Sequence, residues 1–131
     1  MVTEYKHGIE KNVIFSGWLS REEMKTAFFS SNVCVTTSIY FDPFNLFNVE
    51  SMAAGKPVVG TCFGGTPEIV IDNETGYIVN PLNDKLMADK ILNLLEDKTK
   101  AETFGGNGRK RVEENFSLSK QIDKLFNFYN G

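Results

Sequence analysis

The sequence predicts an α/β fold, in which helices flank a parallel sheet and a helical tail follows. Short apolar runs rich in β-branched residues alternate with segments of helical periodicity along the first 80 residues. The apolar runs also lack the polar alternation of half-exposed strands, as strands buried on both faces do. A chain of 131 residues has room for one core, so we expect a single domain over residues 1–131.

The first strand is expected at residues 12–19, NVIFSGWL, an apolar run that contains a glycine near its end. A helix follows over residues 20–31. Ser20 is its N-cap, because Glu23 stands three positions later at the spacing of a capping box. The β-branched run NVCVTTS predicts a second strand over residues 32–38.

Residues 39–44 are expected to form a loop, since Pro43 prevents a helix from running through them. A helix of about residues 45–54 comes next. Gly55 stands at its C-terminal cap, with a proline just beyond it. That proline opens the third strand, residues 57–61.

Residues 62–70 read as a loop with a helical turn, and residues 75–80 as a fourth short strand. Helices dominate from Asn83 onward. The glycines of GGNGR, residues 105–109, predict a local interruption of one helix. The last helix has Ser117 as its cap, and its apolar residues predict that it docks on the domain.

Charge and composition exclude several function classes. The net charge of −3 argues against a nucleic-acid surface. The basic cluster at residues 109–111 is followed by Glu113 and Glu114, which is typical of a solvated helix face. No run approaches the roughly 18 apolar residues of a membrane span, and the N-terminus is too polar for a signal peptide.

The cysteines and the histidine give no support for metal or nucleophile chemistry. Cys34 and Cys62 lie in apolar runs without metal-ligand spacing, so we expect buried, reduced thiols and a cytoplasmic protein. The single histidine, His7, lies in the polar N-terminal segment and is expected at the surface. A Ser-His-Asp arrangement therefore has no available base.

Ligands of such sheets bind beyond the carboxyl ends of the strands. The corresponding loops are residues 17–19, 38–44 and 61–66. The Gly-Lys pair that follows the helix of residues 45–54 is not a phosphate-binding P-loop, because Pro57 stands where a serine or threonine is needed.

Two acidic residues are the candidates for ligand binding at the carboxyl edge of the sheet. Asp42 lies in the second loop, and the helix that follows directs its first N–H groups, from Asn45, Leu46 and Phe47, toward the same crevice. Glu50 lies further along this helix and could accept hydrogen bonds from two vicinal hydroxyls of a ligand. The alternative stays open that Asp42 only starts a turn and Glu50 is solvated.

Residues 38–79, SIYFDPFNLFNVESMAAGKPVVGTCFGGTPEIVIDNETGYIV, resemble the signature region of retaining glycosyltransferases of family 4. The shared elements are two acids eight positions apart, a Gly-x-Pro-Val-Val run, a Gly-Gly-x-Pro-Glu loop and a Thr-Gly-Tyr strand. The resemblance extends to the flanking segments NVIFSGWLSREEM and NGRKRVEENFS. It implies the GT-B fold, with this chain as its Rossmann-like, C-terminal, donor-binding domain.

The resemblance also implies roles for individual residues. Glu50 would hold the ribose hydroxyls of a nucleotide-diphosphate sugar, and Asp42 would contact the donor sugar; these two are the candidate catalytic residues. No metal or other cofactor is implied. The implied nucleotide-sugar-binding positions are Phe15, Gly17, Ser38, Phe44, Asn45, Leu46, Phe47, Gly64, Gly65 and Thr66.

This sequence departs from the family pattern at three positions: Asp42 replaces the usual glutamate, Asn45 a glycine and Ser51 an alanine. The family also takes an arginine and a lysine for the diphosphate from upstream of residue 12, and binds its acceptor glycan or lipid with an N-terminal domain. We therefore expect a partial domain, inactive by itself, whose sheet edge favours self-association. The alternative is a non-catalytic Rossmann-like interaction module.

Overall fold

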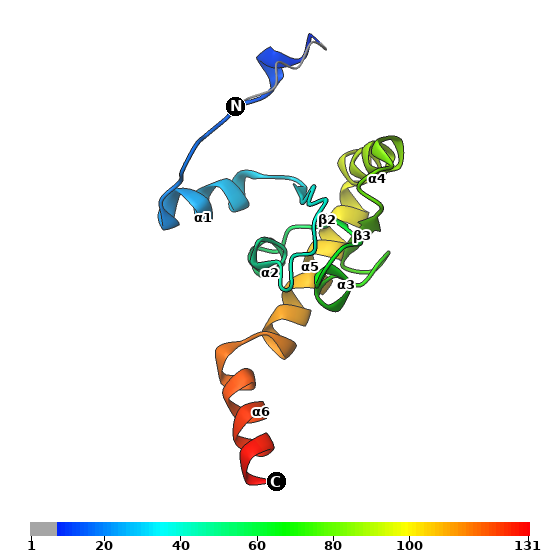
Figure 1. Cartoon of the computed structure of the whole chain (residues 1–131). Coiled ribbons are helices and arrows are strands. Elements are labelled where there is room, and N and C mark those ends of the chain that lie inside the picture. Colours follow the sequence, from blue (N-terminus) through cyan, green and yellow to red (C-terminus); the bar gives the residue numbers. More distant parts are fainter. Residues whose placement is uncertain (1–7) are drawn as a thin grey trace.

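A computed structural model of the chain describes residues 8–131, so His7 lies outside the described residues. Three strands and seven helical segments follow one another along these residues (Figure 1). They are η1 (Glu10–Asn12), α1 (Arg21–Ser30), β1 (Cys34–Val35), α2 (Leu46–Ala53), β2 (Val58–Thr61), α3 (Thr66–Ile69), β3 (Gly76–Val79), α4 (Asp84–Glu96), α5 (Lys98–Asn115) and α6 (Leu118–Asn130).

The strands form one parallel sheet in the order β1-β2-β3. Val58 of β2 is in register with Cys34 of β1 and with Gly76 of β3. Helices α2 and α3 make the two crossovers between neighbouring strands, as parallel strands require. The predicted α/β fold with a helical C-terminal tail is confirmed.

Each face of the sheet has its own apolar core, because successive side chains of a strand point to opposite faces. Val58 lies on one face in a cluster with Phe28 of α1 and Met52 of α2. Val59 lies on the other face in a cluster with Tyr77 of β3 and Leu94 of α4. Helix α5 contributes to both clusters, so it joins the two layers.

Helix α1 begins as its sequence predicts. The Ser20 hydroxyl accepts from the Glu23 N–H at 3.3 Å, and the Glu23 carboxylate accepts from the Ser20 N–H at 2.7 Å. The helix then packs on α2 through the rings of Phe28 and Phe47, whose centroids lie 5.3 Å apart. This ring contact holds α2 against α1.

The predicted strand over residues 12–19 is wrong. This segment is extended but pairs with no described strand, and Phe15 is 70% and Trp18 100% exposed. It leads away from the sheet beyond the start of α1 (Figure 1). An apolar run becomes a strand only where a neighbour accepts its hydrogen bonds, and in the described residues β1 pairs with β2 alone.

The predicted interruption at residues 105–109 is also wrong, because α5 runs unbroken from Lys98 to Asn115. Two of its glycines permit close helix packing. A Cβ at Gly105 would overlap the carbonyl oxygen of Gly55 behind α2, and one at Gly108 would lie 3.2 Å from Met52. The glycines serve a helix contact rather than a helix end.

The basic cluster of α5 is solvated only in part. Arg109 pairs with Glu113 at 3.0 Å, as a solvated helix face predicts. Arg111 instead donates to the carbonyl oxygens of Glu68 and Ile69 at 2.7 and 2.8 Å. It therefore satisfies the C-terminal carbonyl groups of α3, which a four-residue helix leaves open.

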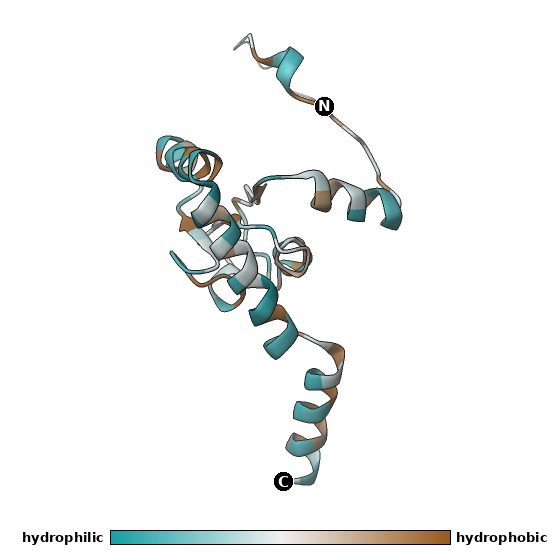
Figure 2. Ribbon diagram, turned by 180° about the vertical axis from the view of Figure 1, so that it is seen from behind, coloured by the Kyte–Doolittle hydropathy of each residue, from teal (hydrophilic) through white to brown (hydrophobic). Residues whose placement is uncertain are grey.

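Two burial predictions are wrong. Helix α6 has no buried residue, so it does not dock on the domain, and its apolar residues line one side of an exposed helix (Figure 2). Cys62 is exposed, because β2 ends one residue earlier, at Thr61, whereas Cys34 within β1 is buried as predicted. None of the described helices is long and apolar enough to cross a membrane.

Candidate functional site

The loops that follow β1 and β2 meet at the carboxyl edge of the sheet. The Gly65 N–H donates to the carbonyl oxygen of Asp42 at 2.8 Å. The Asp42 carboxylate accepts from the Phe44 N–H at 3.2 Å, so Asp42 does form the turn before α2. The rings of Phe41 and Phe63 stack across the two loops at 5.5 Å. These contacts bring Asp42 and the glycine loop together, as the topology predicts.

Glycine is required where the two loops touch. Gly64 has a φ of +69°, and a Cβ there would overlap the backbone of Asp42. A Cβ at Gly65 would likewise overlap the carbonyl oxygen of Pro43. The two loops can therefore lie this close together only because both residues are glycine.

Helix α2 starts at this junction with a side-chain cap. The Asn45 side-chain oxygen accepts from the Asn48 N–H at 3.2 Å, and Asn45 is 5% exposed. The N–H groups of Leu46 and Phe47 precede the first hydrogen bond within the helix, so they stay available to an anion. The ring of Phe47 packs on α1 and that of Phe44 contacts Phe116, which leaves their backbone groups as the candidate ligands.

Sequence reasoning missed a buried polar network behind this helix start. The Asn48 amide oxygen accepts from the Thr36 hydroxyl at 3.1 Å, and its nitrogen donates to the Thr66 hydroxyl at 3.3 Å. All three side chains are buried. One signal was available: Asn48 stands four positions before Met52, on the same face of α2, where an apolar residue is expected.

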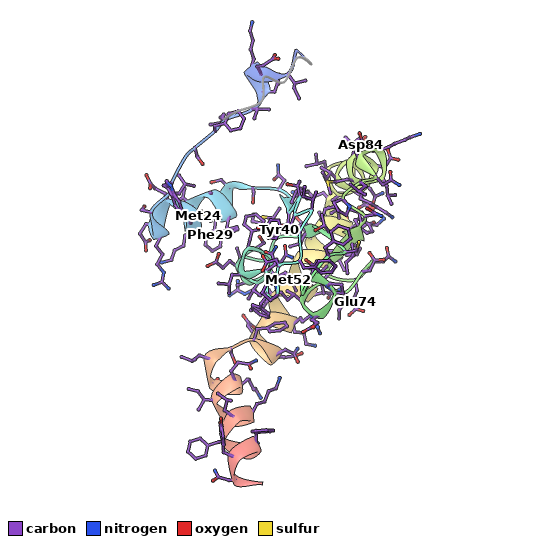
Figure 3. All side chains as sticks on the ribbon, in the orientation of Figure 1. Met24, Phe29, Tyr40, Met52, Glu74 and Asp84 are labelled. Carbon is purple, nitrogen blue, oxygen red and sulfur yellow. The ribbon has the colours of Figure 1, made fainter. Side chains whose placement is uncertain are left out.

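Glu50 lies on the side of α2 that faces α1. With Arg21 and Lys25 of α1 it lines a pocket of about 290 Å³. Apolar residues line the rest of this pocket, among them Met24 and Phe29 of α1 (Figure 3). Glu50 itself is exposed, so its carboxylate can accept hydrogen bonds from a ligand that enters between the two helices.

The structure brings some predicted site residues together and leaves others apart. Asp42, Asn45, Gly64, Gly65 and Thr66 gather where β1 and β2 end. Ser38 is half-buried on the segment that leads from β1 to this loop. Phe15 and Gly17 lie on the extended segment before α1, where a Cβ at Gly17 would meet nothing within 4 Å. Their contact with a ligand stays a prediction.

Within residues 8–131, no three histidine, cysteine or acidic side chains come close enough together to hold a metal ion.

Residues 3–111 match the protein family described as Glycosyl transferases group 1. The chain belongs to this family. The match spans the whole sheet, both site loops and most of α5, so the features described above are those of a glycosyl transferase group 1 domain.

Solved structures similar to this glycosyl transferase group 1 domain are larger than the chain itself. The C-terminal domain of a group 1 glycosyl transferase (LpcC) from Francisella tularensis is 29% identical, with a TM-score of 0.77 over 85% of this chain and 57% of that one. The structure of HepE from Anabaena in complex with UDP-glucose is 27% identical, with a TM-score of 0.83 over 92% of this chain and 33% of that one. The fold is thus that of the C-terminal domain of a GT-B glycosyltransferase.

Among curated relatives, the trehalose synthase of Thermococcus litoralis is 36% identical over 101 residues, which are 77% of this chain and 24% of that protein. The chain spans between 23% and 32% of the length of the curated relatives it matches.

Proposed function

We propose that this chain forms the donor-binding part of a retaining glycosyltransferase, which transfers a sugar from a nucleotide-diphosphate sugar to an acceptor glycan or lipid. One observation carries this proposal: the glycine loop sits directly on the Asp42 loop, beside the first N–H groups of α2. A relative with this fold binds UDP-glucose. The acceptor would be bound by another domain of the complete enzyme.

The proposed donor lies along α2, from the N-terminus of this helix toward its side that faces α1. The N–H groups of Leu46 and Phe47 receive the diphosphate, since a helix N-terminus favours negative charge. Glu50 accepts from the ribose hydroxyls, and the base enters the pocket between α1 and α2. Asp42 contacts hydroxyls of the sugar, with its free carboxylate oxygen.

Transfer breaks the bond between the anomeric carbon and the diphosphate oxygen and forms one to the acceptor hydroxyl, on the same face of the sugar. Negative charge grows on the leaving diphosphate, and the start of α2 stabilises it. The acceptor hydroxyl gives its proton to an oxygen of the leaving diphosphate, so the atoms and charges of the step balance. No described residue of this chain is required to bind a metal in this scheme.

A titration of the ¹⁵N-labelled chain with UDP and with GDP, followed by NMR, tests the proposal. We expect chemical-shift changes at Leu46, Phe47 and Glu50, and weaker binding by Glu50→Ala. Glu113→Ala is the matched control, because Glu113 pairs with Arg109 on α5, away from the site. A folded chain with no shift change at either nucleotide would contradict the proposal and favour the non-catalytic interaction module.

A further inference from the structure

We propose that Asn48 is a positioning residue of the donor site, whose buried amide sets the distance between the start of α2 and the glycine loop. The inference rests on the proposed function and deepens it. Asn48 does not touch the donor. It acts through Leu46 and Phe47 on one side and through Thr66 on the other.

The contacts of Asn48 join three elements that are distant in sequence. Thr36 follows β1 and lies 12 residues before Asn48; Thr66 starts α3 and lies 18 residues after it. Both polar atoms of the Asn48 amide are therefore engaged by hydroxyl groups from separate elements. The Asn48 N–H is engaged as well, by the Asn45 cap.

Strand β2 makes room for this network. A Cβ at Gly60 would lie 2.8 Å from the Thr66 methyl group, 3.3 Å from the Thr36 hydroxyl and 3.6 Å from the Asn48 amide nitrogen. A Cβ at position 60 would therefore overlap the Thr66 methyl group, crowd the Thr36 hydroxyl and touch the Asn48 amide. Strand β2, the start of α2 and the glycine loop therefore pack closely around the Asn48 amide.

The network reaches the ligand-binding groups by short covalent paths. Asn48 stands two residues after Leu46 and two before Glu50 on α2. Thr66 directly follows Gly65, which donates to Asp42. The amide thus connects the proposed diphosphate groups, the ribose carboxylate and the sugar-binding loop.

We expect the buried amide to add little net stability at this point. Apolar side chains of similar volume can replace a complete buried hydrogen-bonded set at little cost, whereas removal of one partner leaves the others unsatisfied. Hydrogen bonds, however, fix direction and distance, which apolar packing does not. The position of the α2 start relative to the glycine loop, rather than stability, should therefore differ between the hydrogen-bonded network and its apolar replacement.

The experiment compares single and complete replacement in the full chain. Thr36→Val keeps the side-chain shape but leaves the buried Asn48 amide oxygen without its donor; we expect roughly tenfold weaker UDP binding, because the start of α2 then shifts relative to the glycine loop. The triple variant Thr36→Val, Asn48→Leu, Thr66→Val should recover the thermal stability that single variants lose, yet still bind UDP roughly tenfold more weakly. Ser51→Ala is the control, since the hydroxyl of the buried Ser51 bonds only to the Phe47 carbonyl oxygen of its own helix.

Hydrogen exchange without nucleotide gives a second readout. In the triple variant the Gly65 N–H should exchange faster, because its bond to Asp42 loosens, while core amides of β2 keep their protection. A triple variant that regains stability, binds UDP as tightly as the wild type and protects Gly65 would overturn the inference. If the wild type itself binds no nucleotide, the proposed function fails, and the Gly65 exchange still decides whether Asn48 positions the loop.

Discussion

Ser20 and Glu23 show how a single pair of residues sets a measurable property of the molecule. The hydrogen bonds from the Ser20 hydroxyl and then from the Ser20 backbone N–H lower the pKa of Glu23 below its ordinary value. A depressed carboxylate pKa contributes stability above the unfolded value and loses it as the pH falls through the folded value. The cap of α1 is therefore complete at neutral pH and weakens in acid.

Replacement of the hydroxyl should be visible in a titration. In Ser20→Ala the pKa of Glu23 should rise toward the ordinary value, since the hydroxyl that lowers it most is gone. NMR titration of the Glu23 carboxyl group measures this directly. Ser16→Ala is the control, because the Ser16 hydroxyl bonds only to its neighbour Gly17; an equal Glu23 pKa in both variants would contradict the cap.

The close approach at Gly64 predicts a different cost from a matched glycine. Gly64 and Gly55 have nearly equal φ values, +69° and +72°, but a Cβ at Gly55 meets nothing within 4 Å. Gly55→Ala should cost about 1 kcal/mol of backbone strain. Gly64→Ala should cost about 1–3 kcal/mol more, because the Asp42 backbone must move. Urea unfolding of both variants measures the difference, and equal costs would refute the overlap.

Local signals in the sequence predicted the residues that act on their own neighbours. The Ser20 cap, the Asn45 helix start and the Gly55 helix end depend on contacts within a few positions, so spacing alone identifies them. The Asn48 network could not be predicted this way. Its partners come from other elements, and only the folded sheet brings Thr36 and Thr66 to the same amide.

At the scale of elements, the contact between α2 and α5 holds the two layers together. Gly105 of α5 faces the carbonyl oxygen of Gly55, whereas its neighbour Gly106 is exposed and meets nothing within 4 Å. The two adjacent glycines thus differ only in what surrounds them. The sequence alone treats both as helix breakers, because it does not reveal which side of a helix another helix covers.

This difference predicts opposite effects of one substitution. Gly106→Ala should stabilise the protein by up to about 1 kcal/mol through helix propensity. Gly105→Ala should destabilise it by about 1–3 kcal/mol, because the added Cβ separates α5 from the end of α2. Thermal unfolding of both variants gives the two signs. Stabilisation by both substitutions would show that the helices do not pack this closely.

The predicted strand of residues 12–19 is wrong because strand formation also depends on neighbouring elements. Its apolar pattern is correct for a strand, but a strand exists only with a partner, and this segment leads away from the sheet instead of pairing with the free edge of β1 (Figure 1). Helix α6 is a second example, because its apolar residues lie along one side as predicted, yet no described element covers them. Periodicity predicts an element and its apolar side, while burial depends on what lies beside it.

At the scale of the whole molecule, one edge of the sheet remains open in the described residues. The N–H groups of Cys34 and Thr36 donate to Pro57 and Val59, both at 3.0 Å. The intervening Val35 therefore directs its N–H away from β2, as alternate residues of a parallel strand do. Exposed apolar side chains lie on the extended segment before α1, among them Ile14 and Trp18. An open edge and apolar surface favour pairing with another chain.

We therefore predict that the chain self-associates through β1 as its concentration rises. Val35→Pro removes the outward N–H while it keeps both bonds to β2, and proline is tolerated at a sheet edge. Sedimentation velocity should show a lower average mass for this variant than for the wild type at equal concentration. Val35→Thr, which alters the same side chain but keeps the N–H, should associate like the wild type. If Val35→Pro also associates like the wild type while it keeps its fold, pairing does not use this edge, and the exposed stripe of α6 becomes the surface to test with Leu125→Lys.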